Sequence, residues 1–317
     1  MHVMSYHVLH ITTPNSKLSV DKGLLFCSTK DDIKKIALAD IKAIIVATYG
    51  VYFSNNCLAK LLEKDVVILH CNEKYQPTGW SLPLERIVRG KVFYNQIAQN
   101  EIFEIELWKK ILKCKITNQA KNLDILECED HNLYKLIEKP LISEANIAKY
   151  YWQNYFMKLG RPQIREHTNA ATFENACLNY GYAVIKTLIY RSIITHGMIA
   201  GLGIHHIGKF KSTPLVYDLM EVYRPFVDYY LYKFNKENSK AFEDEDMREW
   251  AKFISESIRK YRIEINDISY KIIDSIDIYI EKIADAYINF NTSKIFLPQL
   301  EKQYLHLDKH RNREYEE

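Results

Sequence analysis

The 317-residue chain carries 43 Lys and Arg residues against 40 Asp and Glu residues, a formal net charge of +3, and 47% of its residues are apolar. This composition excludes wholesale disorder and allows either one large domain or two modest ones. Because the net charge is small, any nucleic-acid surface must come from local clustering of basic side chains.

The cysteines and the apolar runs limit the class of protein further. The six cysteines include no Cys-x-x-Cys pair, which argues against a structural zinc site and against a disulfide scaffold. We expect reduced, mostly buried thiols at Cys27, Cys57, Cys71, Cys114, Cys128 and Cys177. No apolar run approaches the ~20 residues that span a bilayer, and no signal peptide is visible. We therefore expect a cytoplasmic protein without membrane contact.

The first 80 residues show the short β-branched runs of a β-rich domain. We expect strands at residues 18–20, 23–26, 41–47 and 66–70. One short helix fits among them, because Ser54 can cap its N-terminus and three leucines follow at helical spacing. The Pro- and Gly-containing stretch at 77–83 predicts a break that ends this domain.

After that break the apolar spacing becomes helical. The pattern predicts helices over residues 85–120, 143–158, 173–198, 214–224 and 245–290. The polar stretch 234–246 predicts a loop, and the last fifteen residues are also polar. The sequence thus predicts an α+β protein, with a small β-rich N-terminal domain (residues 1–80) followed by a larger all-α domain (residues 81–317).

The predicted helix at 214–224 carries two carboxylates one turn apart on an otherwise apolar surface. Ser212 or Thr213 can cap this helix, and Pro225 is expected to end it. A buried carboxylate is costly unless it is paired or bound to a cation. Asp218 and Glu221 would also repel each other unless a positive charge lies between them.

Two interpretations of these acids remain open from spacing alone. In the first, Arg224 pairs with Glu221 at i+3, and Asp218 faces water. In the second, the carboxylates coordinate a divalent metal, and a histidine of the upstream Gly203–His206 stretch supplies an imidazole.

A third carboxylate, Glu144, begins the predicted helix at 143–158 and lies on its packed face. By itself it is more typical of a first-turn acid that interacts with the helix dipole.

Five motifs in a fixed order resemble a known family. They are Lys115-Ile-Thr-Asn-Gln119 with Trp108 upstream, Glu144-x-x-x-Ala148, Asn175-Ala-Cys-Leu-Asn-Tyr-Gly-Tyr182, Gly203-Ile-His-His206 and Asp218-Leu-Met-Glu-x-x-Arg-Pro225. Together they are similar to the CRISPR-associated integrases, the catalytic subunits of the spacer-acquisition module. The resemblance covers residues 5–290.

The resemblance implies a catalytic metal site for Mn²⁺ or Mg²⁺. Its ligands would be Glu144, His206 and Glu221, with Asp218 as the supporting carboxylate one turn before Glu221. Alignment of the glycine places the ligand at His206, so His205 would be a neighbour only. Glu221 stands where some family members have Asp, which changes the reach of the side chain but not its charge.

Two basic pairs are candidates for contact with the DNA backbone. Lys209 and Lys211 follow the histidines, in a loop where many family members have an arginine, and Arg161 and Arg165 follow the Glu144 helix. Such contacts would depend on salt and tolerate many sequences. The alternative is that these side chains are solvated surface charges. Tyr180 and Tyr182 could likewise stack on bases or pack in the core.

The family's activity is a metal-dependent endonuclease and integrase reaction. Members join 3′-hydroxyl ends of captured DNA to phosphodiesters at the CRISPR repeat, and no protein nucleophile is needed. The partners implied are double-stranded DNA with 3′ ends, CRISPR repeat DNA, a second copy bound through the β-rich domain to form a homodimer, and the small second CRISPR acquisition protein. The alternatives are a transposase-like integrase of a mobile element and a non-catalytic DNA-binding scaffold.

Overall fold

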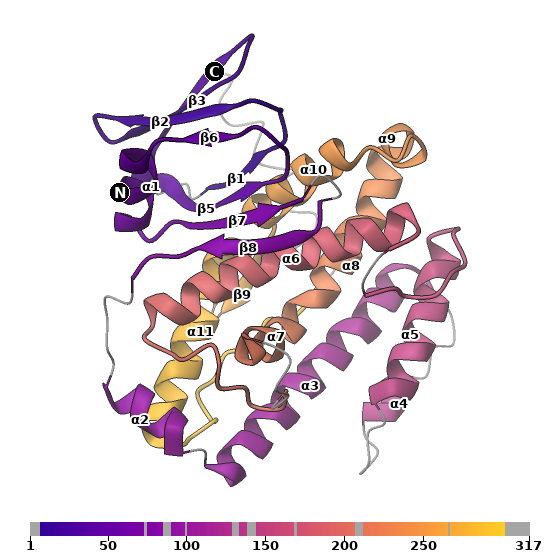
Figure 1. The fold of residues 1–317 in the computed structure, drawn as a ribbon. Coiled ribbons are helices and arrows are strands. Elements are labelled where there is room, and N and C mark those ends of the chain that lie inside the picture. Colours follow the sequence, from indigo (N-terminus) through magenta and orange to yellow (C-terminus); the bar gives the residue numbers. More distant parts are fainter. Residues whose placement is uncertain are drawn as a thin grey trace, which may run out of the picture.

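The computed structural model describes residues 7–72, 75–84, 90–98, 100–128, 133–137, 144–167, 170–206, 212–265 and 267–301. A β-rich N-terminal part packs on top of a larger helical part (Figure 1). The α+β prediction is therefore confirmed. No helix in these ranges combines the length and the apolar character needed to cross a membrane.

The β-rich part consists of two four-stranded sheets. The first has the order β1 (His7–Ile11), β5 (Ile41–Val46), β7 (Val67–Cys71) and β8 (Pro77–Ser81), with β8 antiparallel to three parallel strands. The second has the order β4 (Ile33–Ala37), β3 (Leu24–Ser28), β2 (Lys17–Asp21) and β6 (Tyr52–Phe53). The four predicted strands are confirmed as β2, β3, β5 and β7. The predicted break at 77–83 is wrong in part, because β8 occupies most of it.

Strand β5 belongs to two apolar cores at once. All six of its residues are buried, as is typical of a parallel strand covered on both faces. Ile44 and Val46 pack in the core between the sheets, beside Leu61 of helix α1 (Asn55–Glu63). Ala43 and Ile45 point the other way, into the core of the helical part. Helix α1 begins as predicted, since the Ser54 hydroxyl accepts a hydrogen bond from the Cys57 N–H at 3.1 Å.

Polar contacts fix the same junction. Lys42 of β5 is 4% exposed, and its ammonium lies 3.1 Å from Asp274 and 2.8 Å from Asp277 of helix α11 (Ile272–Asn289). The Ser255 hydroxyl of helix α10 (Met247–Lys260) donates to the Val8 carbonyl at 2.9 Å. The β-rich and helical parts therefore share an interface with buried polar bonds, and their division into separate domains at residue 80 stays a prediction.

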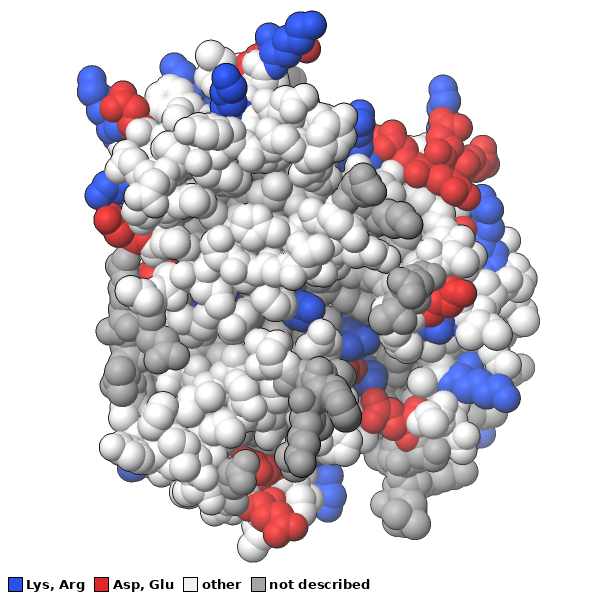
Figure 2. Space-filling view, in the orientation of Figure 1, with Lys and Arg blue, Asp and Glu red and all other residues white. Residues whose placement is uncertain are grey.

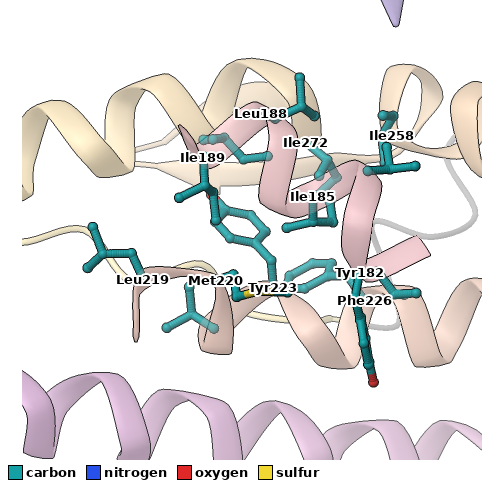
Figure 3. Close-up of a cluster of buried hydrophobic side chains, with 14 of the residues drawn as sticks. Tyr182, Ile185, Leu188, Ile189, Leu219, Met220, Tyr223, Phe226, Ile258 and Ile272 are labelled. Carbon is teal, nitrogen blue, oxygen red and sulfur yellow. The ribbon is translucent and has the colours of Figure 1, made fainter. Parts of the chain in front are cut away.

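The helical part is built around α6 (Phe173–Thr195), which packs against β5 and β7 on one side and against α7, α8 and α11 on the other. Figure 3 shows Met220 and Tyr223 in the buried cluster beside Ile185 and Ile189 of α6. The other elements are α2 (Gly90–Ala98), α3 (Glu101–Ile125), α4 (Leu133–Ile137), α5 (Glu144–Lys158), α7 (Pro214–Met220), η2 (Glu221–Tyr223), α8 (Arg224–Glu237), α9 (Ser239–Glu243), α10 (Met247–Lys260) and α11 (Ile272–Asn289).

Four predictions in the helical part are wrong in their bounds. The predicted helix at 85–120 is divided into α2 and α3, because the extended Asn100 caps the N-terminus of α3. Pro225 does not end a helix: it lies in the first turn of α8, where its missing N–H costs no hydrogen bond. The predicted loop at 234–246 is mostly helical, in α8 and α9. The predicted helix at 245–290 is interrupted by an antiparallel hairpin of β9 (Arg262–Ile265) and β10 (Ile268–Lys271), so the second part is not purely helical.

Candidate active site

Three separate segments bring charged side chains together beside the helical core. Lys115 comes from the middle of α3, Glu144 from the first residue of α5, and Glu221 from η2. The Lys115 ammonium lies 2.6 Å from Glu144 Oε1 and 2.7 Å from Glu221 Oε2. Figure 2 shows basic and acidic side chains side by side in a recess of the surface between the positions of α7 and α5. The two predicted glutamate ligands therefore meet around one positive charge.

Glu221 is buried but keeps its negative charge. Burial alone would raise the pKa of Glu221, but Arg224 and Lys115 outweigh it and hold that pKa below its usual value. Arg224 Nε lies 2.9 Å from Glu221 Oε1, which confirms the predicted i, i+3 pair. The Arg224 guanidinium also stacks over the Tyr182 ring, 4.9 Å from its centroid. Arg224 thus holds Oε1 of Glu221, the carboxylate oxygen that does not contact Lys115.

Asp218 does not face water, so that part of the first interpretation is wrong. Its side chain is completely buried and accepts hydrogen bonds from the loop before α7. Asp218 Oδ2 accepts from the backbone N–H groups of Ile204 at 2.7 Å and His205 at 3.0 Å. The His206 ring bonds Asp218 Oδ1 through Nδ1. The helix keeps this buried acid because the acid holds the histidine loop in place.

Gly203 makes this tight loop possible. A Cβ at position 203 would lie 2.7 Å from the His206 carbonyl oxygen and 2.8 Å from Pro214 Cβ. Such contacts are too short for any side chain, so the loop could not fold back over Asp218 with another residue there. The motif therefore requires glycine at position 203 because there is no room for a side chain.

The two adjacent histidines have different surroundings. The His205 ring stacks face to face on Trp108, with centroids 4.3 Å apart and planes 5° apart. His206 meets Trp108 edge-on and lies within electrostatic range of Glu221. Because the Asp218 carboxylate accepts at His206 Nδ1, the Nε2 lone pair of His206 is the one available to a ligand. The assignment of His206 as the metal ligand stays a prediction.

The candidate ligands suit a divalent cation, although the Lys115 ammonium lies between Glu144 and Glu221. Among the described residues, no three His, Cys, Asp or Glu side chains are close enough together to hold a metal ion. Glu221 Oε2 is buried and makes no hydrogen bond of regular geometry to any described residue; its close contact is the Lys115 ammonium. Two carboxylates and a carboxylate-oriented imidazole are ligands that Mn²⁺ and Mg²⁺ accept. The residues therefore fit such an ion chemically.

The predicted DNA-binding residues differ in their positions. Lys209 and Lys211 lie outside the described residues. Arg161 is exposed, near Glu174 at 3.5 Å. Arg165 is 9% exposed and donates to Asn175 Oδ1 at 3.0 Å and Asn179 Oδ1 at 2.6 Å, which favours a structural role. Contact of these residues with DNA stays a prediction. Tyr180 and Tyr182 are both buried, so they pack in the core.

Two features of the site were not predicted. Lys115 belongs to a quoted motif, but nothing in its spacing showed that its ammonium reaches two acids on other segments. The second feature is a buried cluster around Asp228 of α8, which is fully buried. Tyr151 donates to Asp228 Oδ2 at 2.7 Å, and the Tyr182 hydroxyl donates to Oδ1. Asp228 follows Glu221 by seven residues, a helical spacing that could have indicated a shared face.

Comparison with known proteins identifies the family of this chain. A family model described as CRISPR associated protein Cas1 matches residues 9–265. A CRISPR-associated endonuclease Cas1 of Neisseria meningitidis serogroup C is 28% identical over 223 residues, which cover 67% of this chain and 70% of that relative.

Two solved structures share the fold. A casposase bound to integration product superposes with a TM-score of 0.77 at 16% identity, covering 95% of this chain and 97% of that one. A chain of a Cas6-RT-Cas1–Cas2 complex superposes with a TM-score of 0.73 at 17% identity, covering 94% of this chain and 36% of that one. Since the family model spans most of the sequence, the chain belongs to the CRISPR associated protein Cas1 family.

Proposed function

We propose that this chain is a metal-dependent DNA integrase and endonuclease of CRISPR adaptation, which joins 3′-hydroxyl ends of captured DNA to phosphodiesters at the repeat. The observation that carries the proposal is that Glu144 and Glu221 converge on one positive charge, the Lys115 ammonium. Beside them, a buried carboxylate orients the His206 ring. Membership in the Cas1 family and the relative named as an endonuclease support it.

Each residue of the site has a separate task in this proposal. Glu144, Glu221 and His206 would hold Mn²⁺ or Mg²⁺, which when bound neutralises charge on a phosphate oxygen and aligns the attacking hydroxyl. Asp218 fixes the His206 tautomer and ring orientation through Nδ1. Arg224 keeps Glu221 ionised and in place. The exposed Arg161 is available to the DNA backbone.

A matched pair of adjacent histidines gives the sharpest test. Strand transfer is measured on supercoiled plasmid carrying a repeat, with Mn²⁺, for His206→Ala and His205→Ala. His206→Ala is expected to lower the rate of strand transfer by at least ~100-fold, because a ligand that positions the reacting groups is lost. His205→Ala removes the stack on Trp108 and an edge-on contact with the His206 ring but keeps the backbone hydrogen bond to Asp218, and it is expected to keep most activity. An inactive His205→Ala variant together with an active His206→Ala variant would show that His205 is the ligand.

The proposed partners follow from the same reaction. They are DNA with 3′ ends, repeat DNA, a second copy of this chain bound through the β-rich part, and the small second acquisition protein. A similar fold in a Cas1–Cas2 complex supports the last of these. Light scattering of the full chain at micromolar concentration is expected to give a dimer, and a monomer would exclude the homodimer.

A second candidate is a transposase-like integrase of a mobile element, because the casposase has a similar fold. That function predicts full activity without the second acquisition protein and a preference for element ends over repeat DNA. The same plasmid assay, run with and without a Cas2 protein, distinguishes the two functions. A non-catalytic scaffold would show neither activity nor Mn²⁺ binding that depends on Glu144.

A further inference from the structure

The position of Lys115 is set by a polar stripe along one side of α3. Asn118 donates to the Val222 carbonyl at 3.2 Å, and Asn122 donates to the Pro225 carbonyl at 3.3 Å. These residues follow Lys115 at i+3 and i+7, so all three lie on the same side of the helix. That side of α3 is bonded to the segment from η2 to the start of α8, which carries Glu221. Lys115 is therefore directed at the glutamates by its helix and is not a solvated surface lysine.

The Lys115 ammonium occupies the space where a shared cation would lie. Its distances to Glu144 Oε1 and Glu221 Oε2 differ by only 0.1 Å (2.6 and 2.7 Å). The Lys115 and Glu221 side chains are largely shielded, at 12% and 6% exposure, whereas Glu144 is 42% exposed. Two carboxylates this close to one point repel each other unless a positive charge separates them. Lys115 supplies that charge in this structure.

An ammonium and a divalent ion cannot both lie between the same two oxygens, because they repel each other strongly at such short distances. The long, flexible side chain of lysine can swing away at little cost. The Arg224 guanidinium, in contrast, is stacked on Tyr182 and ion-paired with the opposite oxygen of Glu221. Of the two cations that contact Glu221, Lys115 is the one that can leave.

We propose that Lys115 is a built-in counterion that holds Glu144 and Glu221 together in the metal-free protein and gives up its position when a divalent cation binds. Lys115 is thus a positioning residue that lowers the affinity for metal while keeping the site assembled without it. This inference rests on the proposed metal-dependent function. It assigns the lysine of the motif to control of metal binding.

The test is a calorimetric titration of the full-length protein with Mn²⁺ alone, without DNA. The variants are Lys115→Met, which keeps the length of the side chain without its charge, and Lys113→Met, an exposed residue of the same helix, as the matched control. Lys115→Met is expected to bind Mn²⁺ at least tenfold more tightly than the wild type, and Lys113→Met is expected to match the wild type. Glu144→Gln is expected to weaken binding in every background.

Thermal unfolding gives a second, independent readout. In EDTA, Lys115→Met is expected to melt below the wild type, because its two carboxylates face each other without a counterion. Saturating Mn²⁺ is expected to remove or reverse that difference. If Lys115→Met does not fold, Lys115→Gln replaces it in both experiments, since the amide can still donate to one glutamate.

The outcomes separate the two proposals. Wild-type binding that depends on Glu144, with unchanged or weaker binding in Lys115→Met, would overturn the role of Lys115 and leave the metal site intact. No Mn²⁺ binding by the wild type or by Lys115→Met would overturn the metal-dependent function itself, and the counterion role with it.

Discussion

Two carboxylates seven residues apart, Glu221 of η2 and Asp228 of α8, are stabilised in opposite ways. Glu221 is surrounded by cations, which hold its pKa below the usual value despite its burial. Asp228 is surrounded mainly by tyrosines, and burial raises the pKa of Asp228 to about 6, although hydrogen bonds from Tyr182 and Tyr151 oppose the shift. Helix α5 contributes to both clusters, with Glu144 at its start and Tyr151 two turns later.

The difference separates a site that can exchange a cation from one that only holds helices together. Around Glu221 the charges compensate each other through ion pairs, one of which involves a flexible lysine. Around Asp228 the partners are hydroxyl groups in the closed interior: Tyr155 also donates to its backbone carbonyl at 2.8 Å. We therefore expect substitutions at the first cluster to lower activity and substitutions at the second to lower stability.

The largest effect is expected at the first cluster. Glu221→Gln keeps the shape of the side chain but removes the charge that pairs with Arg224 and Lys115. Strand transfer is expected to fall by at least ~100-fold, because the positioning of the reacting groups is lost. The exposed Glu243→Gln serves as the control. Near-normal transfer by Glu221→Gln would mean that this acid is structural, like Asp228.

A somewhat smaller loss is expected for Asp218→Asn. The amide cannot accept as many hydrogen bonds from the loop, and its NH₂ group would face the His206 N–H. Residues that orient a metal ligand typically contribute 10–100-fold to metal affinity or activity. We expect a decrease of that size both in strand transfer and in Mn²⁺ affinity. Normal values for both would show that the buried acid does not position His206.

The second cluster is tested by Tyr151→Phe. This change removes the donor to Asp228 Oδ2 and the acceptor of the Asn122 amide, which lies at 2.8 Å. Leaving buried polar groups without partners is expected to lower the free energy of unfolding by about 1–3 kcal/mol, as measured by urea denaturation. Transfer by the folded variant is expected to stay within a fewfold of wild type. The exposed Tyr49→Phe should change neither quantity.

The raised pKa of Asp228 also predicts a pH dependence. An aspartate whose pKa is about 6 in the folded state and near 4 when unfolded binds a proton more tightly in the folded protein. Stability is then lost as the pH rises from about 4 to 6, and the contribution is constant above that range. From pH 4.5 to 7 the loss from this group is on the order of 2 kcal/mol.

Asp228→Asn is expected to remove this part of the pH dependence, and the exposed Asp244→Asn is expected to keep it. The measurement is the difference in the free energy of unfolding between pH 4.5 and 7 for each variant. If this difference is the same for Asp228→Asn as for the wild type, the pKa of Asp228 is not raised in the folded protein.

Much of the fold could be predicted because the apolar pattern is regular where one face is buried. Helices α5 and α6 lie close to their predicted ranges, and Ser54 caps α1 as expected. The prediction failed where tertiary contacts decide the outcome. A proline in the first turn of a helix and a proline just after a helix can have the same neighbouring residues. The local sequence therefore did not show that Pro225 lies at the start of α8. The β9–β10 hairpin interrupts a region whose isoleucines also fit helical spacing.

The site could be predicted only as far as its motifs. The family resemblance selected Glu144, His206, Asp218 and Glu221, but spacing could not show which of them contact each other. Spacing left open whether Asp218 faces water, because its burial depends on a loop that folds back over it, and that fold requires Gly203. Lys115 is 29 residues from Glu144 in sequence, so only the packing of α3 against α5 and η2 brings its charge to the acids.

Strand β5 has a consequence for how the molecule unfolds. Because alternate side chains of this one strand complete two different cores, neither core can be exposed to water while the other stays intact. The chain should therefore lose its structure in one cooperative transition, and the amide protons of β5 should be among the last to exchange with solvent. Removal of the first 80 residues would strip an apolar covering from α6 instead of releasing an independent helical unit.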